Sequence, residues 1–74
     1  MSKLPIISGR KAVKVFVKIG YAVMRQKGSH IRLCHPHKEP LTIPDHKILG
    51  KGLLRKILRD SELSVDEFIF LLKE

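Results

Sequence analysis

The sequence has little of what several classes of protein require. Its single cysteine, Cys34, excludes a disulfide within one chain and is typical of a reducing compartment. No apolar run approaches the ~20 residues of a membrane span, and the N-terminus lacks an apolar stretch of signal-peptide length. We therefore expect a cytoplasmic protein without a membrane anchor. At 74 residues it should form one domain, residues 1–74, with a modest core.

Acidic residues are also scarce, and most of them lie near the C-terminus. Up to Arg59 the chain has 14 lysines and arginines against two acids, a net charge of +12. From Asp60 onward it has one lysine against five acids, a net charge of −4. The basic part predicts a polyanionic partner such as a nucleic acid, with a merely solvated lysine-rich surface as the alternative.

The hydrophobic pattern predicts an α+β fold in the order α-β-β-β-α-α, with helices packed on one face of a three-stranded antiparallel sheet. After a lead-in at residues 1–7, a first helix is expected over residues 9–19, between an N-cap at Ser8 and a stop at Gly20. The apolar stripe assigned to it consists of Ala12, Val13, Phe16, Val17 and Ile19. Strands are expected over residues 21–27, 30–35 and 40–43, and Pro44 should stop the third.

Two further helices follow a basic connector at residues 45–51. The second is indicated by Leu53, Leu54, Ile57 and Leu58. The third should begin with a capping box, in which Ser64 and Glu67 satisfy each other's backbone donors. Leu63 and Phe68 have the spacing of a hydrophobic staple around that helix start.

The segment from Gln26 to Arg32 contains the strongest candidates for chemistry. Gly28 and Ser29 should form a two-residue hairpin loop in which Gly28 supplies a positive φ. Alternation then puts His30, Arg32 and Cys34 on one face of the second strand, and Ile31, Leu33 and His35 on the core face. His30 would thus lie exposed beside two cations, although a surface histidine without a role is an equally simple interpretation.

Other kinds of site fit the sequence less well. Cys34, His35, His37 and His46 could be metal ligands, but adjacent strand residues point to opposite faces, and no paired CxxC or HxxxH spacing is present. A helix-turn-helix is disfavoured because its second helix would bring Asp66 and Glu67 to DNA phosphates. Binding to a membrane surface would need apolar residues of the first helix that the core requires.

Cleavage of RNA fits the candidate residues better. Attack by a ribose 2′-hydroxyl needs a base, positive charge near the phosphate oxygens and an acid for the leaving oxygen. His30 is the candidate for proton transfer, and His46 is a weaker candidate for a second proton-transfer group. The oxyanion could be held by Lys27, Arg32 and the backbone N–H groups of Gly28 and Ser29. Such a reaction needs no metal, so no cofactor is expected.

The whole chain resembles the HicA (YcfA-like) toxin family, with the same spacings throughout. The matching segments are Leu4-Pro5, Ser8-Gly9, Gly20-Tyr21, Arg25-Gln26-Lys27-Gly28-Ser29-His30, His35-Pro36, Ile43-Pro44-x-His46 and Lys51-Gly52-x-Leu54-Arg55-Lys56-Ile57-Leu58. The Gly-Ser-His element is specific only in this context.

The resemblance implies a fold like that of double-stranded-RNA-binding domains and a ribonuclease that cleaves messenger RNA without a metal. It also implies a HicB antitoxin partner that masks the active site. The family's catalytic histidine falls on His30, and Lys51 and Arg55, at the basic start of the second helix, would help to hold RNA. Leu53 departs from the family, which commonly has a small hydroxyl residue there. A non-catalytic RNA-binding module or an inactive toxin homologue is the alternative.

Overall fold

The computed structural model describes residues 3–74 and has six elements in the expected order. They are α1 (Gly9–Lys18), β1 (Ala22–Lys27), β2 (His30–Cys34), β3 (Leu41–Pro44), α2 (Lys51–Asp60) and α3 (Val65–Lys73). The α+β fold class and the α-β-β-β-α-α order are confirmed. The start of the expected lead-in, Met1 and Ser2, lies outside the described residues.

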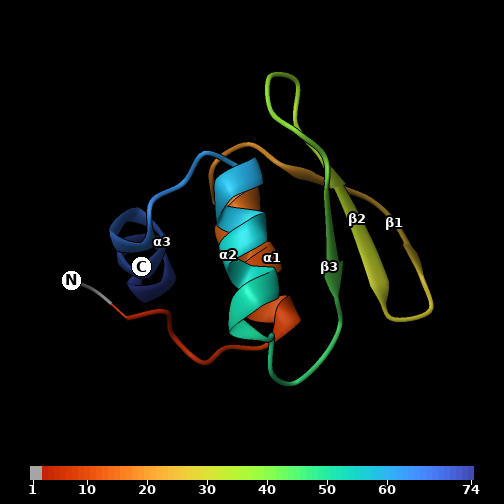
Figure 1. Ribbon diagram of the computed structural model, residues 1–74. Coiled ribbons are helices and arrows are strands. Elements are labelled where there is room, and N and C mark those ends of the chain that lie inside the picture. The colour runs from red at the N-terminus through yellow and green to blue at the C-terminus, as the bar shows by residue number, and fades with distance from the viewer. Residues whose placement is uncertain (1–2) are drawn as a thin grey trace.

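The three strands form an antiparallel sheet in the order β1-β2-β3, so the hairpin strand β2 is central (Figure 1). The third strand is shifted by one residue from its expected range of 40–43, since it begins at Leu41 and Pro44 does not stop it. Pro44 is its last residue and lies opposite His30. Proline is tolerated there because β3 is an edge strand, where one ladder N–H can be missing without breaking the sheet.

Helix α1 begins as the sequence predicts, with the Ser8 hydroxyl accepting the Lys11 N–H at 3.2 Å. Its expected apolar stripe needs one correction, since Val17 is 48% exposed whereas Val15 is buried. Val15 and Phe16 follow Ala12 by three and four residues, the intervals that place side chains on one helix face. Val17 lies outside that stripe.

The core lies between the helices and the inner face of the sheet. Helices α1 and α2 pack against β3, and α3 packs against α1 on the side away from the sheet (Figure 1). Phe16 joins these layers, with ring centroids 5.9 Å from Tyr21 and 5.8 Å from Phe68. Strand β1 extends beyond the helices, and all six of its residues are exposed.

The last two helices differ in how they begin. Helix α2 starts at Lys51, earlier than Leu53, so the end of the expected connector belongs to the helix. Its N-cap is Gly50, which provides no side-chain hydrogen bond. Helix α3 has the predicted capping box, with Ser64 and Glu67 bonded in both directions at 3.0 and 3.1 Å. Within residues 3–74, no helix is long and apolar enough to cross a bilayer.

Candidate functional site

Backbone conformation and hydrogen bonds to backbone carbonyls hold the hairpin corner before His30 in place. Lys27 lies opposite His30, and Gly28 has a φ of +59°, as the two-residue loop requires. The Gln26 side chain donates to the Gly28 carbonyl at 3.0 Å, and the Asp45 N–H donates to the Ser29 carbonyl. Local and long-range bonds therefore hold the loop, and His30 leaves it on the central strand.

The side chains of β2 alternate as the sequence predicts. Ile31 and Leu33 are 4% and 0% exposed, whereas His30 and Arg32 are exposed on the outer face. Within residues 3–74, no side chain is hydrogen-bonded to the His30 ring. Its two nitrogens therefore remain available to an external ligand.

The hairpin register adds a cation to this outer face. With Lys27 opposite His30, Arg25 lies opposite Arg32, and the β-bulge in β1 comes only beyond Arg25, toward Val23. Paired residues of neighbouring strands share a face, and like charges directly opposite each other are destabilising. The fold thus concentrates positive charge where it disfavours its own stability, which indicates a role in binding an anion.

Two hollows meet at His30, Arg32 and Thr42. The first, here called the cationic hollow, has a volume of about 220 Å³ and is completed by Arg25 and Lys27. No acidic residue of the described chain lines it. Arg32 is held at the boundary by a 3.0 Å hydrogen bond from its guanidinium to the Thr42 hydroxyl.

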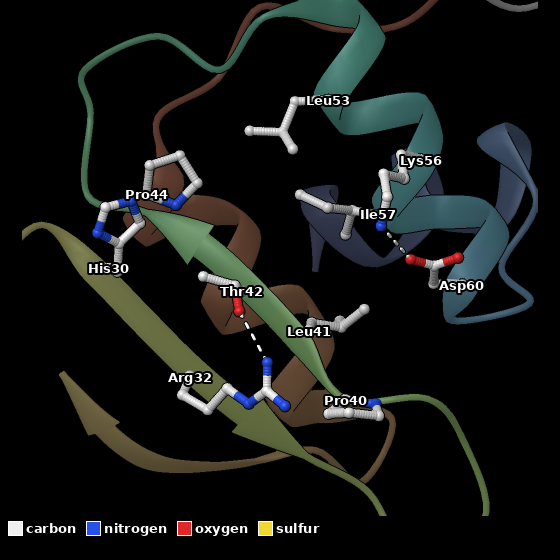
Figure 2. Close-up of a pocket in the computed structure, with 10 residues that line it drawn as sticks. All are labelled: His30, Arg32, Pro40, Leu41, Thr42, Pro44, Leu53, Lys56, Ile57 and Asp60. Carbon is white, nitrogen blue, oxygen red and sulfur yellow. Dashed lines mark hydrogen bonds and ion pairs between the residues drawn. The ribbon is translucent and has the colours of Figure 1, made fainter. Parts of the chain in front are cut away.

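The second hollow, here called the β3–α2 groove, has a volume of about 360 Å³. Besides the three shared residues it is lined by Pro40, Leu41, Pro44, Leu53, Lys56, Ile57 and Asp60. Figure 2 shows His30, Arg32 and Thr42 along the strands, facing the side chains of α2 across the groove. At its far end Lys56 forms a 2.9 Å ion pair with Asp60.

The predicted RNA-binding residues of α2 lie elsewhere. Lys51 and Arg55 are exposed but line neither hollow. They are four residues apart and so share a helix face, whereas Leu53 is two residues from each and points to a different side. The basic residue of α2 that faces the groove is Lys56. The role expected for Lys51 and Arg55 remains a prediction, and it concerns a separate surface.

The other histidines are placed apart from His30. His46 is exposed in the connector, where its carbonyl accepts the Gly9 N–H at 2.9 Å, and it lines neither hollow. The Nδ1 of His35 accepts the backbone N–H of His37, and its Nε2 lies 3.2 Å from the Ile19 carbonyl. Within residues 3–74, no three His, Cys, Asp or Glu side chains are grouped to share a metal ion.

The helix–strand junction explains why His35 is engaged in this way. Gly20 has a φ of +105°, and a Cβ there would lie 2.9 Å from the His35 ring. The neighbouring Tyr21 donates to the Glu39 carbonyl at 2.8 Å. Burial, followed by the negative charges of Asp60, Glu39 and Glu62, raises the pKa of the Tyr21 phenol. These contacts are structural and leave His30 as the histidine of the candidate site.

Sequence reasoning missed three contributors to this site. Arg25 faces Arg32 because both lie two residues beyond the Lys27–His30 pair, so strand alternation from the hairpin loop could have indicated it. Thr42 fixes Arg32 through the β2–β3 register. Lys56 was not among the residues expected to bind RNA. The spacing of Leu53, Lys56 and Asp60, three and then four residues apart, could have indicated one face of a helix.

Comparison with known proteins gives one match. A family model described as the HicA toxin of bacterial toxin-antitoxin systems matches residues 9–63, which includes every element from α1 to α2 and the whole outer face of the sheet. No curated protein and no solved structure matches the chain significantly.

Proposed function

The chain belongs to the HicA toxin family of bacterial toxin-antitoxin systems, and we propose that it is an endoribonuclease that cleaves messenger RNA with His30 as a proton-transfer group. One observation carries this proposal: His30 is exposed, its ring is free of hydrogen bonds to residues 3–74, and it lines the cationic hollow. Histidine is the side chain that titrates near neutral pH, so it can accept or donate a proton there.

The cations of the hollow would stabilise negative charge on the phosphate while His30 transfers a proton. A phosphate beside His30 would lie against Lys27, Arg25 and Arg32, whose positive charge stabilises the additional negative charge of a pentacoordinate phosphorus. Arg32 is held by Thr42, so little reorganisation is needed when the charge develops. The backbone N–H groups of Gly28 and Ser29 are further donors at the same corner.

The reaction then follows from these groups. The ribose 2′-oxygen loses its proton to a base and forms a bond to phosphorus, while the bond from phosphorus to the 5′-oxygen breaks. The leaving oxygen takes a proton from an acid. The products are a 2′,3′-cyclic phosphate and a 5′-hydroxyl, and neither step requires a metal. His30 supplies one of the two proton transfers.

Family membership implies an antitoxin partner, and we propose that this partner is a HicB-like protein that covers the His30 face. The exposed cations of that face suit an acidic protein surface as well as RNA. With messenger RNA as substrate, the toxin would act in the cytoplasm.

A non-catalytic RNA-binding module is the second candidate. It is favoured by the fact that His30 is the only histidine among residues 3–74 that lines either hollow, so no second histidine is in place for the other proton transfer. Such a module would use the same cations for phosphates without cleaving the chain.

The experiment that separates the two compares three proteins, purified free of antitoxin, on single-stranded RNA in EDTA. They are the wild type, His30→Ala and, as a matched control, His37→Ala, which removes an exposed histidine outside both hollows. We expect His30→Ala to lower the cleavage rate by ~100- to 10,000-fold with RNA affinity nearly unchanged. His37→Ala should keep wild-type activity, and the products should carry 2′,3′-cyclic phosphate ends. RNA that stays intact yet is bound by all three proteins would establish the binding module.

A further inference from the structure

The two hollows that meet at His30 differ in their chemistry. The cationic hollow is lined by charged and polar side chains, whereas the β3–α2 groove has an apolar floor. Leu41 and Ile57 in that floor are 2% and 3% exposed, and Pro44 is also buried. Leu53 forms the α2 side of the groove and remains 36% exposed. An open apolar surface next to concentrated positive charge suits a ligand that has both an apolar and an anionic part.

The polar groups of the groove lie at its far end and along its border with the cationic hollow. The Lys56–Asp60 pair provides an ammonium donor and carboxylate acceptors beyond the apolar floor. Thr42 and Arg32 form the border on the opposite side (Figure 2). An occupant would therefore contact aliphatic side chains with its faces and hydrogen-bonding groups with its edge.

A nucleotide has this combination of properties. Its phosphate is anionic, and its base is a planar ring with apolar faces and a hydrogen-bonding edge, joined to the phosphate through one sugar. The groove volume of about 360 Å³ falls within the ~300–1,000 Å³ typical of small-molecule sites. Because both hollows share His30, Arg32 and Thr42, one nucleotide could occupy both of them.

We propose that the β3–α2 groove is a nucleobase subsite, which receives one unpaired base of an RNA strand whose phosphate lies in the cationic hollow. This inference rests on the proposed function and adds to it a determinant of substrate choice. The base lies against Leu53 and Ile57 and directs its edge toward Lys56 and Asp60. A paired and stacked base cannot enter such a groove, so single strands are selected over duplexes.

The subsite is tested by comparing ligands that differ only in the base. Protein labelled at its methyl groups and backbone nitrogens is titrated with the four ribonucleoside 5′-monophosphates and with ribose 5-phosphate, and chemical shifts are followed by NMR. We expect the nucleotides to shift the methyl signals of Leu53, Ile57 and Leu41. Ribose 5-phosphate should shift the backbone signals of the cationic hollow without those methyl signals, and it should bind about fivefold or more weakly, as expected for the loss of the apolar contact with one base.

A matched pair of variants locates the base contact. Leu53→Asn makes the groove wall polar without adding charge, and Val17→Asn makes the same kind of change at a 48% exposed position that lines neither hollow. Leu53→Asn should weaken nucleotide binding about fivefold or more, because it removes apolar contact with the base, while leaving the affinity for ribose 5-phosphate unchanged. Val17→Asn should leave both affinities unchanged.

Equal affinities and equal shifts for nucleotides and ribose 5-phosphate would overturn the subsite. This outcome can be told apart from failure of the ribonuclease proposal. Cleavage of RNA by the wild type without any response of the groove to a base would leave the enzyme standing and remove the subsite. A base-dependent response in a protein that cleaves no RNA would leave the subsite standing and remove the enzyme.

Discussion

The hairpin corner at His30 and the C-terminal helix α3 differ in how far their charged and polar groups are paired within the chain. In α3 the local interactions are matched: Ser64 and Glu67 form a closed capping box, acidic residues occupy the first turn, and Lys73 is in the last. Phe68 is fully buried against Phe16. At the corner, two arginines oppose each other and the His30 ring has no partner within residues 3–74.

This difference indicates what each region is for. Groups that satisfy one another contribute to stability and leave nothing for a ligand. Like charges held together and a free imidazole stabilise the fold little, but they are available to an anion. We therefore expect the corner to bear the proposed function and α3 to contribute to packing, a division that mutations can test.

The largest effect on stability is expected at Phe68. Phe68→Ala should lower the free energy of unfolding by ~3–5 kcal/mol, because it leaves a cavity beside Phe16. Phe70→Ala, in the same helix but at a position 65% exposed, is the control and should change it by less than ~0.5 kcal/mol. Urea unfolding measures both, and Phe68→Leu is a milder substitute should the alanine variant not fold.

The free energy of unfolding of His30→Ala, also measured with urea, gives the comparison with Phe68→Ala. We expect its unfolding free energy to stay within ~0.5 kcal/mol of the wild type, since the side chain is exposed and forms no hydrogen bond within residues 3–74. Together with the loss of cleavage described above, this would separate function from stability. A stability loss comparable to that of Phe68→Ala would instead make His30 a structural residue.

An intermediate effect, opposite in sign for stability and binding, is expected at Arg25. Arg25→Glu places a carboxylate opposite Arg32 and should raise the free energy of unfolding by ~0.2–1 kcal/mol. RNA binding should weaken, and the log-log slope of affinity against salt should fall by about 0.7 for the phosphate contact that is lost.

Arg59→Glu is the control for Arg25→Glu because it changes the net charge equally at an exposed position outside both hollows. Affinity measured over a series of salt concentrations compares the two variants. Equal weakening by both would mean that net charge alone, rather than the corner, binds RNA.

A stability effect between those of Phe68→Ala and Arg25→Glu is expected at the cap of α3. Ser64→Ala should lower the free energy of unfolding by ~0.5–2 kcal/mol. The pKa of the Glu67 carboxyl is lowered from 4.5, chiefly by the hydrogen bond that it accepts from the Ser64 backbone N–H and then by its interaction with the Ser64 hydroxyl. A carboxyl with a lowered folded-state pKa stabilises the fold above its unfolded pKa, and this contribution is lost as the pH falls through the folded value.

The pH dependence can be isolated with Glu67→Gln. The difference in unfolding free energy between the wild type and this variant should shrink between about pH 6 and about pH 3. Unfolding curves across this range measure it. A difference that does not vary with pH would show that the Glu67 charge contributes nothing to the cap.

Much of the fold could be predicted because it depends on interactions between residues that are close in sequence. The helix cap at Ser8, the capping box at Ser64 and the positive φ of Gly28 are properties of a few consecutive side chains. The alternation of His30, Ile31, Arg32 and Leu33 follows from strand geometry. The sequence alone therefore determined the order of the elements and the exposure of His30.

The surroundings of His30 were decided by contacts between segments distant in the chain. The β2–β3 register brings Thr42 opposite Arg32, and the Thr42 hydroxyl then holds that guanidinium. The packing of α2 against β3 places Leu53 and Lys56 across the groove from Arg32. A local pattern can indicate which residues share a face of α2, but which strand that face meets depends on contacts between distant segments. The tertiary structure alone therefore decided that His30 lies between a cationic and an apolar hollow.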